Sequence, residues 1–282
     1  MWCIRYDETF LIFNISYIKK RGIIAPFFIT FTKNLRYLIN ISMKNIIAIF
    51  LLSALVFTAC KKEVEPVSLN VAFKPTNKGS GVVAGGILKD VDNKNFLLDE
   101  FKFYISNIEV TDVKDVKTKI NRVVLYDLGV NDYDIFYDIP EGNYKSISFG
   151  LGLDTATNNT NPNSVDETDP LSISQGTYWD MLKYRFVVLE GKFDSTVAGN
   201  TTPNKPFALH IGTDQMYRTV EVFKPFEITG GKNYVELPFE INELFYSTTD
   251  TIRFSEHYSN DSENEVQLDY GNRIMNFFKN AF

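Results

Sequence analysis

Cysteine and histidine are scarce in this sequence. Its 282 residues include two Cys and two His. Two Cys exclude a multi-cysteine zinc site and a scaffold held by several disulfides, and two His exclude a histidine-rich metal centre. Basic residues are also outnumbered, with 29 Lys plus Arg against 35 Asp plus Glu and a net charge of −6. Because neutralising phosphates needs a basic face, we expect no nucleic-acid partner.

The common catalytic motifs are absent as well. The chain contains no Gly-x-Ser-x-Gly, Walker or His-Glu-x-x-His motif, and the Gly-x-Gly within Phe149–Asp154 lacks a third glycine. Paired carboxylates occur throughout so acidic a chain and therefore select no site. We expect that the protein is not an enzyme. The chain does have 44% hydrophobic and 15% aromatic residues, which is enough for a sizeable core.

The segment Met43–Cys60, MKNIIAIFLLSALVFTAC, has the outline of a secretory signal peptide. A lysine precedes a short apolar stretch, and small residues lead to Cys60, as in a bacterial lipobox. The apolar run is shorter than the ~20 residues that a membrane-spanning helix needs. We therefore predict that Cys60 is lipidated and anchors a secreted protein to the outer membrane, facing either the periplasm or the cell exterior.

Residues 1–42 precede this signal and are rich in Ile, Phe, Asn and Lys. We interpret them as translated upstream sequence before a true start at Met43; an N-terminal membrane hairpin is the alternative. Residues 1–59 hold seven of the basic and two of the acidic residues. The mature chain therefore has 22 Lys plus Arg against 33 Asp plus Glu and a net charge of −11. Its one remaining cysteine, Cys60, is consumed by the lipid, so no disulfide can form within one chain.

After a charged tether at residues 61–67, the pattern is that of short strands separated by Pro, Gly and Asn turns. Such spacing predicts an all-β fold, an antiparallel β-sandwich with long loops, in one domain over residues 68–282. A parity slip predicts a bulge near Ser106–Asn107, and Tyr270–Asn280 has the spacing of a short C-terminal helix. The expected strands are Ser68–Phe73, Phe101–Val110, Asn121–Leu128, Asn143–Leu153, Tyr184–Phe193, Lys205–Ile211, Tyr217–Ile228 and Asn233–Ile241.

Five segments resemble the MbnP-like copper-binding lipoprotein family, in family order across roughly residues 68–245. The joint match of Tyr-Ile-Ser-Asn, Pro-x-Gly-x-Tyr…Phe-Gly-Leu-Gly-x-Asp and Leu-His-x-Gly is specific, although each piece alone is weak. The segments are FKFYISNIEV (Phe101–Val110), VVLYDL (Val123–Leu128), IPEGNYKSISFGLGLD (Ile139–Asp154), YWDMLKYRFVVLEGKF (Tyr178–Phe193) and FALHIG (Phe207–Gly212).

The resemblance implies a secreted β-rich protein that binds copper through histidine and a Trp oxidised to kynurenine. Trp179 matches the modifiable Trp, His210 matches a histidine ligand, and Met181 stands where relatives carry Trp or His. Opening the indole ring gives an aromatic amine that, like a thioether, suits Cu(I). In an extended segment Met181 would project to the same side as Trp179. The resemblance also implies a diheme peroxidase-like partner that oxidises the Trp.

Each of these residues also has a purely structural interpretation. Trp179 fits a core aromatic, Met181 a gap-filling side chain and His210 a hydrogen-bonded structural histidine. The other imidazole, His257, we interpret as a surface residue and only an outside candidate for a ligand. The alternative function is a structural or adhesive envelope lipoprotein that keeps the fold without the metal.

Overall fold

The computed structural model describes residues 66–130, 136–256, 258–261 and 264–282. The predictions for residues 1–42, for the signal peptide with Cys60, for most of the tether and for His257 lie outside these ranges. Within them, no helix combines the length and the apolarity needed to cross a bilayer. The chain from Val64 to Phe282 forms one compact unit, which is the unit described below.

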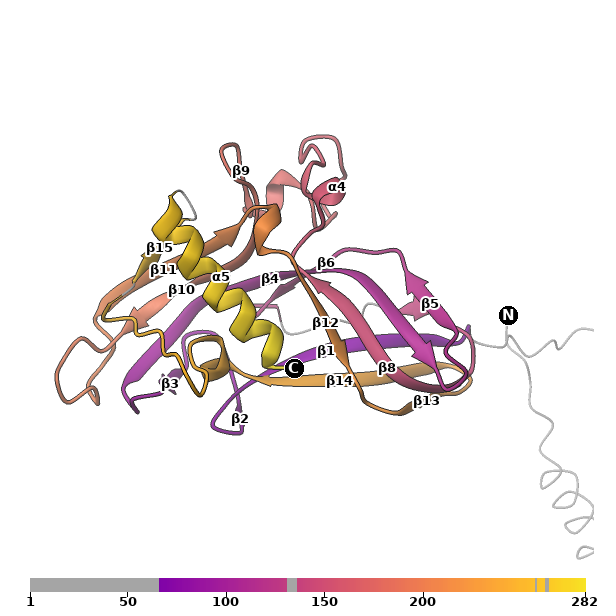
Figure 1. Ribbon diagram of the computed structural model, residues 1–282, viewed down its shortest axis with the longest axis horizontal. Helices are drawn as coiled ribbons and strands as arrows, with labels where there is room; N and C mark the ends of the chain where they lie inside the picture. Colours follow the sequence, from indigo (N-terminus) through magenta and orange to yellow (C-terminus); the bar gives the residue numbers. More distant parts are fainter. Residues whose placement is uncertain (1–65, 131–135, 257, 262–263) are drawn as a thin grey trace, which may run out of the picture. The chain divides into compact units, whose positions relative to one another are not determined.

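Strand is the predominant regular structure over the described residues, which confirms the all-β prediction. The large sheet runs in the order β12-β8-β4-β10-β11-β15, with shorter strands paired to β8, β4 and β10 (Figure 1). Its members are β3 (Ile87–Lys89), β4 (Asn95–Asp112), β5 (Lys117–Ile120), β6 (Val124–Asp127), β8 (Gly142–Leu151), β9 (Tyr178–Trp179), β10 (Lys183–Phe193), β11 (Lys205–Gly212), β12 (Arg218–Val222), β13 (Phe226–Ile228) and β15 (Ser259–Asn260).

The second sheet is small and packs under the first. It contains β1 (Ser68–Asn77), β2 (Ser80–Gly81), β7 (Tyr137–Asp138) and β14 (Lys232–Glu240). Pairing is mainly antiparallel, but β1 pairs in parallel with β14, and β11 in parallel with β15. The prediction of an antiparallel sandwich did not include these two parallel pairs, which join segments far apart in the sequence.

The long strand β4 is shared by the two halves of the large sheet. Its first part, up to Phe103, pairs with β10, and its second part, from Ile105, pairs with β8. The register shifts between Ser106 and Glu109, and Asn107 has a positive φ of 50°. This confirms the predicted bulge, which bends the strand where one neighbour replaces the other.

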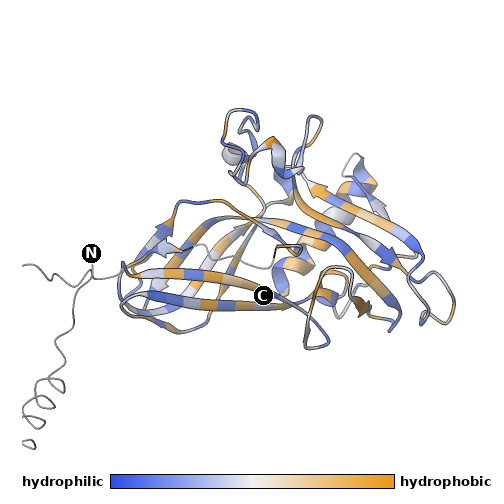
Figure 2. Cartoon of the chain, turned by 180° about the vertical axis from the view of Figure 1, so that it is seen from behind, coloured by the Kyte–Doolittle hydropathy of each residue, from blue (hydrophilic) through white to orange (hydrophobic). Residues whose placement is uncertain are grey.

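An aromatic core lies between the sheets, and the helix α5 (Glu265–Asn280) helps to close it. Figure 2 shows apolar and polar residues alternating along the strands. Phe278 of α5 packs edge-on against Phe103 at 5.1 Å between ring centroids, and Phe239 contacts Phe278 at 5.3 Å. The helix begins five residues before its predicted start, because the Asn264 side chain accepts a hydrogen bond from Gln267 N and caps the first turn.

One predicted strand is divided further. The predicted strand Tyr217–Ile228 is broken into β12 and β13, with the unpaired residues 223–225 ending in a proline. A one-turn helix, α4 (Thr155–Asn158), follows β8 and is capped by Asp154. Three 3-10 helices, Ile173–Gln175, Asp214–Met216 and Ile241–Leu244, complete the chain's regular structure over the described residues.

Candidate functional site

Trp179 lies on a short hairpin that extends β10 beyond the edge of the sheet. Trp179 pairs with Lys183 and Tyr178 with Tyr184, and Leu182 N donates to Trp179 O at 3.1 Å to close the turn. The hairpin projects at the point where β10 separates from β4 (Figure 1). The Trp179 side chain is 38% exposed. It is therefore accessible from solvent and is not the buried core aromatic of the structural interpretation.

Met181 lies in the turn itself, so the expectation of an extended segment is wrong at this position. β9 ends at Trp179, and Met181 is 71% exposed. Beside it is a cavity of about 290 Å³, formed with Asn158 and with residues 213–215, which follow β11. Thr213 has a strained φ of 78°, and its hydroxyl oxygen is buried with no hydrogen-bond partner among the described residues.

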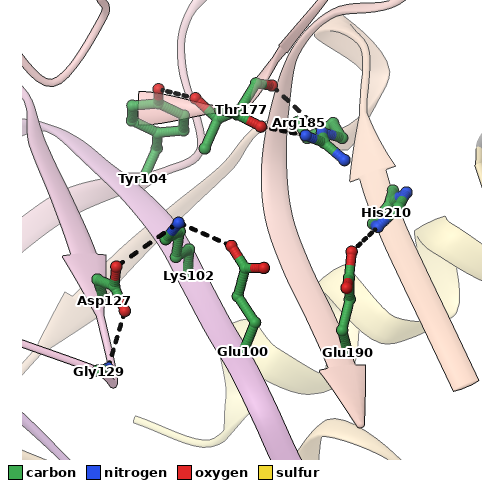
Figure 3. Close-up of polar contacts among 10 residues, drawn as sticks. Glu100, Lys102, Tyr104, Asp127, Gly129, Thr177, Arg185, Glu190 and His210 are labelled. Carbon is green, nitrogen blue, oxygen red and sulfur yellow. Dashed lines mark hydrogen bonds and ion pairs between the residues drawn. The ribbon is translucent and has the colours of Figure 1, made fainter. Parts of the chain in front are cut away.

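A buried tyrosine network fixes the polypeptide that leads into this hairpin. The Tyr104 hydroxyl lies 2.6 Å from the Thr177 hydroxyl (Figure 3). It also donates to Pro170 O at 2.8 Å. The Tyr184 hydroxyl donates to Leu171 O at 2.7 Å. Burial raises the pKa of Tyr104 and of Tyr184, so both stay protonated donors. Sequence reasoning missed this network, because nothing local marks a strand tyrosine as the partner of a distant loop.

His210 lies on β11 with its neighbours Leu209 and Ile211 fully buried in the core, so its ring faces outward. Its Nδ1 is 2.8 Å from Asp261 Oδ1, and its Nε2 is 2.7 Å from Glu190 Oε1. Both ring nitrogens are thus within hydrogen-bonding distance of a carboxylate oxygen. Binding of a metal ion at either nitrogen would require the loss of one of these two contacts.

The Glu190–His210 pair of this cluster continues a row of polar side chains that includes Glu100, Lys102 and Asp127 (Figure 3). Glu190 lies directly opposite Glu100 in the β10–β4 ladder. Lys102 lies 2.7 Å from Glu100 and 3.6 Å from Asp127. Burial lowers the pKa of Lys102, but the two carboxylates outweigh that effect and raise it. Each glutamate of the like-charged pair thus has a hydrogen-bonding neighbour of its own, Lys102 for Glu100 and His210 for Glu190.

The structure does not bring the three predicted ligands together. Trp179 pairs with Lys183 and His210 with Val188, so five residues of β10, roughly 16 Å of strand, separate the two positions. The two carboxylates at His210 contact opposite edges of its ring and cannot converge with it on one ion. Over the residues with described positions, no group of three or more His, Cys, Asp or Glu side chains is arranged to hold a metal.

Comparison with known proteins decides the family. The sequence model of the MbnP family matches residues 66–267 of the chain. The chain belongs to the MbnP family. This confirms the resemblance read from the five sequence segments.

Among solved structures, the chain is similar to "MbnP from Methylosinus trichosporium", with a TM-score of 0.47 and 18% sequence identity. The match covers 67% of this chain and 80% of that one. No curated protein matches the chain.

All three predicted ligands lie within the part of the chain that matches the MbnP family. The match also includes Glu190 and Asp261, the carboxylates that bind His210 and that sequence reasoning missed. Glu190 alternates with apolar residues along β10 as an outward-facing residue would, but that pattern did not indicate its partner. The copper site and the lipid anchor remain predictions.

Proposed function

We propose that the protein is a lipid-anchored member of the MbnP family that binds copper at the cell envelope, with Cu(I) as the favoured ion. Family membership supports this proposal, and the signal-like segment that ends at Cys60 supports the anchor. Copper binding would serve acquisition, storage or delivery of the metal, and no turnover is implied. The outer membrane is the proposed location.

One observation supports a location on the molecule for the proposed copper site. Trp179 and Met181 are both exposed on the same projecting hairpin, within the family's matched range. A solvent-accessible indole is open to oxidation by a diheme peroxidase-like partner, and an exposed thioether is a soft ligand for Cu(I). Kynurenine formation at Trp179 would supply the aromatic amine that the intact indole lacks.

The residues as they lie do not form a complete site for the ion. His210 is bound at both ring nitrogens and is separated from the hairpin along β10. Its participation requires the loss of one carboxylate contact and a rearrangement at the hairpin. We therefore assign no coordination geometry and keep Trp179 and Met181 as the primary candidates, with His210 as the third.

A Cu(I) titration of the chain from residue 61, against a competing chelator, tests this proposal. We expect His210→Ala and Met181→Leu each to weaken Cu(I) binding by at least about tenfold. Substitution of residues that only support the metal ligands already lowers metal affinity by about that factor. Met275→Leu is the matched control, because Met275 is fully buried in α5. Equal Cu(I) affinity in all variants would contradict the proposed site. Peptide mapping of copper-loaded native protein reports oxidation at Trp179 in the same preparation.

The second candidate is a metal-free structural or adhesive envelope protein. The two carboxylates on His210 favour it, because they give the histidine a complete structural role without a metal. The same titration discriminates between the candidates. Absence of Cu(I) binding in both the parent chain and the oxidised native protein would favour the structural role.

A further inference from the structure

The described chain enters the sandwich at one identifiable end. Val67 O accepts a hydrogen bond from Ile139 N at 3.3 Å, and Ser68 N donates to Gly231 O at 3.0 Å. β1 therefore starts beside residues 139–140 and the start of β14. In Figure 1 this is the end at which β5 and β13 lie. We call it the tether end.

The turn between β4 and β5 lies at the tether end and carries two exposed valines. Val113 N donates to Asn143 O at 3.0 Å, which fixes the turn against the start of β8. Val113 and Val116 also line a groove of about 310 Å³ together with Pro140 and Tyr144. Since Pro140 follows the residue that bonds to Val67, the valines are neighbours of the point where the chain enters.

These valines are held outward by a rigid backbone. Each is 58% exposed, and the Asp112 carboxylate accepts hydrogen bonds from Lys114 N at 2.7 Å and Val116 N at 2.8 Å. Such turns usually carry polar residues, because nothing in them contacts the core. Two apolar side chains on a preformed tip therefore indicate a surface that something apolar covers.

A second group at the same end combines an aromatic and a cation. Tyr234 pairs with Asn70, two residues after the start of β1, and is 57% exposed. Its ring packs edge-on against Phe136 at 5.3 Å, and the Lys232 ammonium lies 4.6 Å from the Phe136 ring centroid. Tyrosine and lysine with this amphipathic arrangement suit the boundary between lipid headgroups and acyl chains.

We propose that the tether-end surface, made of Val113, Lys114, Val116, Lys232 and Tyr234, lies against the membrane lipid that holds the anchor. The proposal rests on the lipid anchor in the proposed function. Only the five residues 61–65 separate the lipidated cysteine from the described chain, and the distance from Cys60 to residue 66 is at most about 20 Å when this segment is extended. The end of the sandwich next to the tether is thus kept within reach of the bilayer.

Site-specific labelling of the mature lipoprotein in vesicles tests this. The mature chain has no cysteine besides Cys60, whose sulfur carries the lipid, so Val116→Cys and Val197→Cys each give a single labelling site. Val197 is 98% exposed and lies in the loop that bonds to Asn95 at the start of β4. It is therefore about 50 Å from the β4–β5 turn along that strand, which makes it the matched control.

With an environment-sensitive fluorophore in phosphatidylethanolamine–phosphatidylglycerol vesicles, we expect a blue shift and quenching by nitroxide lipids at position 116 and neither at 197. Val113→Ser in the Val116→Cys background should reduce the quenching, because it removes one of the two apolar side chains from the turn. The turn itself should be preserved, since the Asp112 hydrogen bonds to the backbone are kept. A blue shift without quenching would indicate contact with another copy and overturn the lipid surface. Equal spectra at both positions in a chain shown by mass to be lipidated would contradict the proposed membrane contact alone. A chain found by mass to carry no lipid would contradict both the anchor at Cys60 and the membrane contact.

Discussion

At the scale of single residues, His210 shows why the candidate site was only partly predictable. Its place in the Leu-His-x-Gly strand was visible in the sequence. Its two partners were not, because Glu190 precedes it by 20 residues and Asp261 follows it by 51. No local period reports such contacts, so the state of the ring nitrogens required the fold.

Gly191 is another residue whose role depends on a distant strand. It follows the register shift between β10 and β4, where the two backbones approach closely. A Cβ added at Gly191 would lie 2.0 Å from Leu97 O, which belongs to the backbone and has little room to move.

We therefore expect Gly191→Ala to lower the free energy of unfolding by about 1–3 kcal/mol, as overpacking does. Urea unfolding followed by circular dichroism measures the change. Gly81→Ala is the control, because its added Cβ would meet nothing within 4 Å. Equal midpoints for the two variants would show that the ladder relaxes around Gly191.

At the scale of elements, the strands and the helix were predictable because alternation and helical spacing are local. The bulge in β4 was also predictable, since the parity of its apolar residues changes within the strand. The parallel pair β1–β14 was not, because its strands are separated by most of the domain. The Met181 turn was missed for a related reason: the strand-like composition around it hides a hairpin that Lys183, with a φ of 62°, helps to form.

A two-point ion pair adds to the apolar packing that attaches α5 to the rest of the domain. Arg273 donates to both oxygens of Asp250, at 2.7 and 2.6 Å. These hydrogen bonds to Arg273 lower the pKa of Asp250 in the folded protein. A lowered folded pKa gives stability that is present above the unfolded value, about 3.9, and is lost as the pH falls through the folded one.

Asp250→Asn should therefore cost about 0.5–1 kcal/mol at neutral pH, since the pair is partly exposed, and should make stability fall less steeply between about pH 4 and pH 2. Unfolding midpoints across this pH range check both effects. Arg273→Lys keeps the charge but loses the two-point geometry, and should give an intermediate loss. If the stability of Asp250→Asn fell with pH as steeply as that of the parent chain below about pH 4, the acid sensitivity would belong to other carboxylates.

At the scale of the whole molecule, β1 connects the entry of the chain to its C-terminal half. Nine residues of β1 pair with β14, from Ser68 with Lys232 to Thr76 with Glu240. β1 also buries Leu69, Val71 and Phe73, and the Phe73 ring contacts Phe103, Phe149 and Phe282 at 5.3 to 5.9 Å between centroids. The small sheet and the end of the chain are therefore organised around this one strand.

The boundary of the folding unit follows from this arrangement. Burial of three large apolar side chains contributes about 5–9 kcal/mol, which is comparable with the whole stability of a typical domain, about 5–15 kcal/mol. We expect the chain 61–282 to fold cooperatively, because the compact unit begins at Val64. A chain starting at residue 78 should lose cooperative unfolding and aggregate, because it also exposes the edge of β14. Size-exclusion chromatography and thermal melts of the two chains measure the difference, and a monomeric, cooperatively melting 78–282 chain would show that the large sheet and α5 are stable without β1.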